Sequence, residues 1–390
     1  MFKKLAILAV ATFWLVGIDL HPDTAPPRPQ RPRAAKTSAR APSKRAARVS
    51  GSSAQRARSR RRARRRRYNP WRLSSFGEPA SDDNPAGEDA AIRQAALDAL
   101  GNWNGSIVVV DPNSGRVLSI VNQRLALSSG FTPCSTFKPV VALGALKEGI
   151  ITPKTRIVGD GGRRVNVTDA LAKSNNRFFS KLGEMLGFTR LTRYAHEFGL
   201  GEPASRSIPG ESPGRFPSAP PKQGGVGYLA YYGQDMEVTP LQMAALISAI
   251  ANGGTLYELQ YPRVPEEQAN FRPIVRRRLD DLAAYIPQVR EGLAAAVLYG
   301  TGRSAYDPDL SIYGKTGTCS EDGARLGWFV SYADDLQAKY VVVVLLRGGR
   351  MMFGPHAAEI AGRLYRELRD HGHNATQANR LGAFANPAQR

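Results

Sequence analysis

Ser135 and Lys138, in the stretch Ser135-Thr136-Phe137-Lys138, have side chains whose types and spacing suit nucleophilic chemistry. The segment Phe137 to Leu146 is typical of a buried helix, and positions three apart share one face of a helix. Lys138 can therefore lie beside Ser135 and take its proton, provided that burial and nearby positive charge lower the lysine pKa. Alone the pair is a weak signal, because a solvated lysine at an exposed helix start has the same spacing.

Two further polar motifs follow this pair along the chain. Ser174-Asn175-Asn176 lies in a tight turn between helical stretches, and Lys315-Thr316-Gly317-Thr318 lies on a strand that begins after Gly314. Alone, the first is almost uninformative, and the lysine of the second could simply sit on an exposed edge strand. All three motifs in this order, each in the expected local structure, indicate a serine acyl-transfer site.

The elements that must position these motifs change in type along the chain. Five β-branched or apolar runs predict strands, at Ser106–Val110, Val117–Val121, Ser311–Thr318, Trp328–Tyr332 and Tyr340–Leu346. Helical patterns occur at Ala90–Leu100, Phe137–Leu146, Val167–Leu186, Leu191–Phe198, Pro240–Ile250 and Ala357–Arg369. Strands at both ends with helices between them predict an α+β fold, in which the terminal strands share an antiparallel sheet and the middle forms an all-α subdomain. A cleft between the two parts is the expected site.

The sequence from about Gly105 to Leu368 resembles penicillin-binding proteins and serine β-lactamases. The similarity includes the opening strand and turn at 108–115, the run 170–179 around the second motif, and Gly327 to Val330. Val238 to Ala244, followed by Ala251-Asn252-Gly253-Gly254, is similar to transpeptidases and is generally lacking in β-lactamases. The resemblance implies the β-lactamase/transpeptidase-like fold, with an antiparallel five-stranded sheet flanked by helices and an all-α subdomain.

The resemblance also implies a peptidoglycan D,D-transpeptidase or D,D-carboxypeptidase that penicillin acylates. Ser135 would attack the carbonyl between two terminal D-alanines of a stem peptide and form an acyl-enzyme. Lys138 would accept the serine proton, and Ser174 would relay a proton to the leaving amine. β-Lactams would act as covalent inhibitors of the same serine.

The remaining motif residues would then bind substrate. Asn176 would hydrogen-bond the substrate amide, and Lys315, Thr316 and Thr318 would hold its carboxylate. The backbone N–H of Thr318, with that of the nucleophile, would form the oxyanion hole. Gly317 has no side chain, so we expect the substrate backbone to approach this strand closely.

The two cysteines flank this predicted site. Cys134 precedes the nucleophile where the transpeptidase pattern usually has glycine, and Cys319 directly follows the third motif. Because the two segments flank the same site in this fold, we expect a Cys134–Cys319 disulfide that clamps the oxyanion hole; two buried thiols are the alternative. A disulfide would favour export, since the cytosol keeps thiols reduced. Two cysteines, and five histidines without HExxH-type spacing, predict no metal site, and no cofactor is expected.

Composition predicts four regions. Lys3 and Lys4 precede an apolar run at 5–18, so residues 1–20 are expected to be a signal anchor or signal peptide. The Arg-, Pro- and Ala-rich residues 21–84 are expected to be a disordered linker. The transpeptidase domain is predicted at 85–372 and a flexible tail at 373–390. This order would place the catalytic domain on the periplasmic or extracytoplasmic side of the cytoplasmic membrane.

The net charge of +21 comes from the linker. Residues 28–67 hold 17 of the 54 lysines and arginines and no acidic residue, whereas the chain beyond Tyr68 has 35 basic and 31 acidic residues. Nine arginines between 56 and 67 predict adhesion to anionic lipid or other polyanions, without specific recognition of nucleic acid.

Two other functions compete with the transpeptidase hypothesis. A serine β-lactamase needs a base for its deacylating water; Glu197, Glu202 and Glu211 lie between the second and third motifs, in no context typical of that role. The short interval from Ser135 to Ser174 also argues against class A enzymes. A catalytically idle β-lactam sensor or scaffold would keep the fold alone, and the complete set of motif side chains argues against it.

Overall fold

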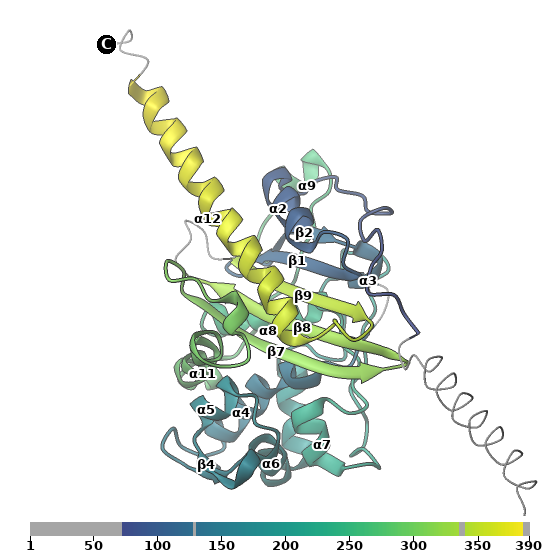
Figure 1. Ribbon diagram of the computed structural model, residues 1–390, viewed down its shortest axis with the longest axis vertical. Helices are drawn as coiled ribbons and strands as arrows, with labels where there is room; N and C mark the ends of the chain where they lie inside the picture. Colours follow the sequence, from purple (N-terminus) through teal and green to yellow (C-terminus); the bar gives the residue numbers. More distant parts are fainter. Residues whose placement is uncertain (1–71, 128–129, 335–339, 385–390) are drawn as a thin grey trace, which may run out of the picture. The chain divides into compact units, whose positions relative to one another are not determined.

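Five strands form one antiparallel sheet in the order β2-β1-β9-β8-β7 (Figure 1). The computed structural model describes residues 72–127, 130–334 and 340–384, with side chains described as far as 370. The strands are β1 (Gly105–Asp111), β2 (Arg116–Val121), β7 (Ile312–Glu321), β8 (Ala324–Ala333) and β9 (Tyr340–Gly348). N- and C-terminal strands meet where β1 pairs with β9. The predicted α+β fold with a five-stranded antiparallel sheet is confirmed.

Helices cover the sheet and form a separate group beyond the β7 edge, where Figure 1 shows α4, α5, α6, α7 and α11 together. The α-helices are α2 (Ala90–Leu100), α3 (Gln123–Leu127), α4 (Lys138–Lys147), α5 (Val167–Ala172), α6 (Asn176–Glu197), α7 (Gly225–Tyr232), α8 (Pro240–Ala251), α9 (Pro265–Ala269), α10 (Asp280–Ala283), α11 (Ile286–Leu298) and α12 (Gly354–Phe384). The short elements are the 3-10 helices η1 (Cys134–Phe137), η2 (Asp160–Gly162) and η3 (Arg303–Ala305), and the strands β3 (Ile157–Val158), β4 (Arg164–Val165), β5 (Thr255–Tyr257) and β6 (Val275–Arg278).

Alternate residues of the central strands enter two hydrophobic cores, one on each face of the sheet. On β9, Val341 and Val343 belong to the core that includes α4, α6 and α8. Val342 and Val344 belong to the core that includes α2 and α12. Because both faces are covered, β9 is a continuous apolar run and not an alternation of apolar and polar residues.

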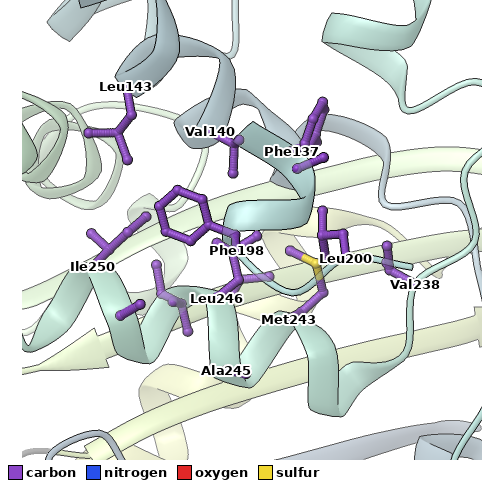
Figure 2. Close-up of a cluster of buried hydrophobic side chains, with 14 of the residues drawn as sticks. Phe137, Val140, Leu143, Phe198, Leu200, Val238, Met243, Ala245, Leu246 and Ile250 are labelled. Carbon is purple, nitrogen blue, oxygen red and sulfur yellow. The ribbon is translucent and has the colours of Figure 1, made fainter. Parts of the chain in front are cut away.

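α8 supports the helix that follows the predicted nucleophile. Every residue of α8 is buried, and Thr239 and Gln242 form a capping box at its start. In Figure 2, Phe198 lies between Val140 of α4 and Leu246 of α8. Burying a side chain of this size contributes roughly 1.5–3 kcal/mol. This core therefore holds α4 in a constant position against the sheet.

The helical region agrees with the sequence prediction at its breaks and differs in the helices that were not predicted. The helical pattern expected at Val167–Leu186 is divided into α5 and α6 at the turn expected at Ser174-Asn175-Asn176, where the backbone of Ser174 has φ 53°. α6 contains the break expected between Leu186 and Leu191: the backbone of Gly187 is not helical, with φ 76° and ψ 163°, so two helical stretches meet there at a kink. α7 and α11 were not predicted; glycines lower the helix propensity of α7.

The predicted boundaries at the two ends of the chain are only partly covered by the described residues. α12 continues to Phe384, past the expected end of its helix at Arg369 and the predicted domain boundary at 372. The expected membrane segment and most of the linker lie outside the described residues, so these boundaries stay predictions. No helix within the described ranges has the length and apolar character needed to cross a membrane.

Candidate active site

Ser135 lies on a 3-10 turn that leads directly into α4. Pro133 precedes this turn, η1, and the backbone N–H of Lys138 donates to the carbonyl of Ser135. Side chains three apart eclipse one another in a 3-10 helix, so Ser135 and Lys138 leave the backbone on the same side. Ser135 is partly exposed, whereas Lys138 is 0% exposed. The nucleophile candidate is thus accessible and the base candidate is buried.

The second motif holds the Lys138 amine. Lys138 Nζ donates to Ser174 O at 2.7 Å, to Ser174 Oγ at 3.1 Å and to Asn176 Oδ1 at 2.6 Å. None of the hydrogen bonds among the described residues joins Nζ to the hydroxyl of Ser135. The structure therefore brings the predicted base to the second motif, and it does not form the Ser135–Lys138 hydrogen bond that the spacing permits.

Burial and a second lysine set the electrostatics of this base. Desolvation lowers the pKa of Lys138 well below its ordinary value, the positive charge of Lys315 lowers it further, and Asp160 opposes both. Lys315 is itself 0% exposed, and burial lowers its pKa to about 7. These are the two conditions under which a lysine can serve as a general base.

The start of α6 is fixed by two side chains that cap it. Asn175 Oδ1 accepts from the backbone N–H groups of Phe178, at 3.0 Å, and Asp160, at 3.1 Å. The Asp160 carboxylate accepts from the N–H groups of Asn176, at 2.8 Å, and Arg177, at 3.1 Å. A carboxylate is stabilising at a helix N-terminus. Sequence reasoning missed Asp160, because Asp160-Gly161-Gly162 has the composition of an ordinary turn.

The third motif lies on β7, the edge strand of the sheet next to the helical group. An edge strand leaves alternate N–H and C=O groups without a neighbour, and an extended peptide can pair with them. Thr318 is exposed, and its Oγ1 accepts from the N–H of Gly354 at 2.8 Å. Thr316 is buried, and the Lys315 amine donates to the Thr316 carbonyl at 3.0 Å. Of the three side chains expected to hold a carboxylate, only Thr318 is exposed.

Gly317 has a structural role that differs from the expected one. A Cβ at this position would lie 3.0 Å from the carbonyl oxygen of Pro133, 3.1 Å from Thr136 Cγ2 and 3.2 Å from Cys134 Cβ. These distances are tighter than most real Cβ contacts. The absent side chain therefore lets η1 pack closely against β7, and this packing brings the first and third motifs together.

A disulfide joins the same two elements. Cys134 of η1 and Cys319 of β7 are bonded, with 5.7 Å between their Cα atoms and a sequence separation of 185. Cys134 has φ 53°, in the left-handed region that favours glycine. The cross-link therefore connects the residue before the candidate nucleophile to the end of the third motif.

A loop after α11 connects the second and third motifs, and sequence reasoning missed it. Thr301 N donates to the carbonyl of Ala172 at 3.0 Å, and Thr301 Oγ1 lies 2.5 Å from Thr316 Oγ1. A Cβ on Gly300 would collide with the Ala172 carbonyl. The only available signal was the pattern Gly300-Thr301-Gly302, shortly before the third motif.

The three glutamates considered for a β-lactamase water have other partners. Glu211 accepts from the N–H groups of Ala204, at 2.7 Å, and Ser205, at 2.9 Å, and burial raises the pKa of Glu211 to about 7. Glu202 forms ion pairs with two arginines of β6. Glu197 forms one with an arginine of its own helix. No described hydrogen bond joins any of the three to a motif side chain.

Comparison with known proteins places this site in a family. Residues 105–366 match the family described as penicillin binding protein transpeptidase domain. The chain is 30% identical over 286 residues to stage V sporulation protein D of Bacillus subtilis, covering 64% of this chain and 44% of that protein. It is 24% identical over 352 residues to the peptidoglycan D,D-transpeptidase MrdA of Acinetobacter baumannii, covering 70% and 52%. The chain spans about half the length of these curated relatives.

Solved structures share the fold. The transpeptidase domain of penicillin-binding protein 3 from Burkholderia pseudomallei superposes with a TM-score of 0.61 at 23% identity, covering 74% of this chain and 96% of that one. PBP2 of Pseudomonas aeruginosa, solved in complex with WCK 5153, gives a TM-score of 0.59 at 23% identity, covering 73% and 77%. With the family match over most of its length, this chain belongs to the family of penicillin-binding protein transpeptidase domains.

Proposed function

We propose that this chain is a peptidoglycan D,D-transpeptidase that forms an acyl-enzyme at Ser135 with D-Ala-D-Ala stem peptides, and that β-lactams acylate the same serine. One observation carries the proposal. Lys138 is fully buried, its pKa is lowered, and its amine is held by Ser174 and Asn176 one turn from a partly exposed serine. The lowered pKa makes the neutral amine, whose lone pair can accept a proton, easier to reach, and this is the form that a general base needs.

The proposed reaction begins with proton transfer from Ser135 Oγ to Lys138 Nζ while Oγ attacks the peptide carbonyl carbon. The N–H groups of Ser135 and Thr318 would stabilise the oxyanion, an interaction worth about 3–4 kcal/mol per donor in related sites. Collapse expels the terminal D-alanine as an amine, which takes the proton. The 3.1 Å contact between Lys138 Nζ and Ser174 Oγ supports Ser174 as the relay. An acceptor amine, or water in a carboxypeptidase, then cleaves the ester.

The same arrangement supports a binding role for Asn176. Its Oδ1 accepts from Lys138, whereas its Nδ2 has no hydrogen-bond acceptor among the described residues. Nδ2 is therefore available to donate to the carbonyl of the substrate amide. We assign the substrate carboxylate to Thr318 on the exposed edge of β7, with Lys315 and Thr316 supporting it from the buried side of the strand.

Intact-mass measurement after benzylpenicillin treatment, followed over time, tests the proposal. We expect a penicilloyl adduct on the wild type that persists, and no adduct on Ser135→Ala. Rapid loss of the adduct with return of active protein would instead indicate a β-lactamase. A persistent adduct without turnover of a D-Ala-D-Ala donor would indicate a sensor or scaffold. No adduct on folded wild type contradicts the proposal.

We also propose that the N-terminal segment attaches the protein to the cytoplasmic membrane, with the catalytic domain outside the cytosol. The Cys134–Cys319 disulfide supports an oxidising compartment. Treating intact and lysed cells with a membrane-impermeant fluorescent penicillin tests the orientation. We expect cells in which only the outer envelope is permeabilised to be labelled as strongly as lysed cells. Labelling that occurs only after lysis of the cytoplasmic membrane would contradict the proposed orientation.

A further inference from the structure

A pocket of about 770 Å³ lies next to Asn176. Its walls come from Ile150, which follows α4, and from the β3–β4 hairpin with the residues just before it, α6 and α7. Four basic side chains line it, and we refer to the space as the basic pocket: Arg156, Arg164, Arg177 and Lys181. The only acidic residue in its lining is Glu184.

The three arginines of the basic pocket have no carboxylate partner. Among the described residues, none of Arg156, Arg164 and Arg177 takes part in an ion pair, whereas Lys181 pairs with Glu184 at 3.2 Å. Arg164 donates to the backbone carbonyl of Arg156 at 2.6 Å, which fixes part of the hairpin. The nearby Asp160 carboxylate is already bonded to two backbone N–H groups of α6. Positively charged side chains from separate elements therefore line the same pocket, and a bound anion would reduce the repulsion between them.

The basic pocket is continuous with the proposed donor site through Asn176. This residue lines the pocket, while its Oδ1 accepts from the Lys138 amine at 2.6 Å. Its free Nδ2 is the proposed donor to the amide of the acyl-donor peptide. Tyr231, which also lines the pocket, belongs to α7, the helix that packs against η1. The part of a donor that lies beyond this amide would therefore enter the pocket.

We propose that the basic pocket binds a carboxylate of the acyl-donor peptide, carried on the part of the peptide that precedes the D-alanine pair. This inference rests on the proposed function and specifies its substrate. Arginine suits the role because its planar fork binds a carboxylate through two hydrogen bonds. Ile150, Val158 and Met185, which is 43% exposed, line the same pocket and suit the aliphatic part of an acidic side chain.

Two penicillins that differ by one carboxylate test the inference. Carbenicillin is benzylpenicillin with one additional carboxylate on the carbon next to the side-chain amide. The quantity to measure is the ratio of their second-order rate constants for acylation of Ser135. We expect Arg177→Gln and Arg164→Gln each to lower the carbenicillin-to-benzylpenicillin ratio by up to about five-fold, as for loss of one exposed ion pair. The double variant should lower it further, and 0.5 M salt should weaken the preference in the wild type.

Arg163→Gln is the matched control, because Arg163 is an exposed neighbour of Arg164 that does not line the pocket. Its ratio should equal that of the wild type. An equal fall in Arg163→Gln would overturn the inference, since it would indicate the general field of the surface. Unchanged ratios in both pocket variants would also overturn it. Failure of the wild type to form any Ser135 adduct is a different result, which defeats the proposed function and this inference together.

A pair of peptide thioester donors extends the test to the peptide itself. The two donors carry either a free carboxylate or a carboxamide on the residue before the terminal D-alanine. We expect the wild type to prefer the carboxylate, and Arg177→Gln to lose most of that preference. A wild type that uses both donors equally well would overturn the inference even if the penicillins differ.

Discussion

Two lysines without a carboxylate partner dominate the site at the scale of single residues. Lys138 and Lys315 are both 0% exposed, and neither takes part in an ion pair among the described residues. A buried ammonium is costly, so burial lowers the pKa of each amine and shifts it toward its neutral form. The neutral form of Lys138 is the one that can accept the proton of Ser135. In the proposed mechanism, burial thus makes Lys138 a base, and the charge of Lys315 couples the two lysines.

This coupling predicts the pH dependence of acylation. The rate constant for acylation by benzylpenicillin should rise with pH as Lys138 loses its proton, with a midpoint below the ordinary lysine value of 10.5. The charge of Lys315 lowers the pKa of Lys138, so Lys315→Met should move the midpoint of this rise in rate to higher pH. Stopped-flow rates across pH measure both effects. A midpoint that stays in place or moves to lower pH in the variant would contradict the electrostatic coupling between the two lysines.

Burial of Lys315 also predicts how stability depends on pH. Its folded-state pKa of about 7 lies below the 10.5 of an exposed lysine, so the unfolded chain binds more protons between these values. The free energy of unfolding should therefore rise as pH increases from about 7 to 10.5, by at most about 1.4 kcal/mol per pH unit from this group. Urea unfolding of wild type and Lys315→Met at several pH values measures the difference. Parallel curves would contradict the prediction.

At the scale of elements, η1, β7 and the loop at 299–302 form one connected unit around the candidate nucleophile. Gly317 permits the close packing of η1 on β7, and the Cys134–Cys319 disulfide cross-links the same pair. Thr301 contacts Thr316 of β7 through its hydroxyl and Ala172, at the end of α5 just before the second motif, through its backbone N–H. Each contact joins segments that are distant in sequence, so the three motifs are held mutually and not by a single element.

The disulfide prediction separates cross-linking from backbone strain. Cys134→Ala/Cys319→Ala should lose about 2–5 kcal/mol, because the cross-link closes a long loop in the unfolded chain. Cys134→Gly/Cys319→Ala loses the same bond, but glycine tolerates the φ of 53° at position 134 and should recover about 1 kcal/mol. Guanidinium unfolding without reductant measures both variants. Equal stability of the two would contradict the assigned strain.

Thr301 is predicted to be a positioning residue. Thr301→Val keeps the shape but removes the hydroxyl that contacts Thr316. Loss of one hydrogen bond of this kind should lower the acylation rate constant about two- to ten-fold. Thr301→Ser keeps the hydroxyl and should restore most of the rate. If both variants are equally slow while their thermal midpoints match the wild type, the hydroxyl has no positioning role.

At the scale of the whole molecule, the sheet joins the two ends of the domain. β1 lies between β2 and β9, so strands from the N- and C-terminal parts of the chain are neighbours. The described residues belong to a unit that begins at Tyr68, and the strongly basic residues 28–67 precede it. Charge and catalytic chemistry therefore occupy separate parts of the sequence.

Deleting residues 28–67 should separate the two properties. We expect the acylation rate constant of Ser135 to stay within about two-fold of the full chain, because the surface pairs that could couple them are weak. Sedimentation with vesicles containing anionic lipid should fall strongly, since the deleted segment has 17 basic residues and no acidic residue. A large loss of acylation would show that the segment contributes to the site.

Much of the fold could be predicted from periodicity. All five strands and the helices α2, α4 and α8 lie within a few residues of their expected positions, because local patterns report which face of an element is apolar. The division between α5 and α6 falls at the turn expected at Ser174-Asn175-Asn176, although the helical pattern of Val167–Leu186 runs through it; the left-handed backbone at Ser174 interrupts the helix there. α7 was hidden by its glycines, whose low propensity is overridden by packing.

The sequence by itself determined which residue types are present for acyl transfer: Ser135 and Lys138, a second motif at Ser174, and a third at Lys315. Only the tertiary structure decided that Lys138 binds Ser174, 36 residues away, and not Ser135, and that Lys315 is buried beside it. It alone also revealed the Thr301 contact and the basic pocket. The physical reason is that periodicity describes one element at a time. Contacts between distant segments, and the pKa values that follow from burial, depend on how all the elements pack together.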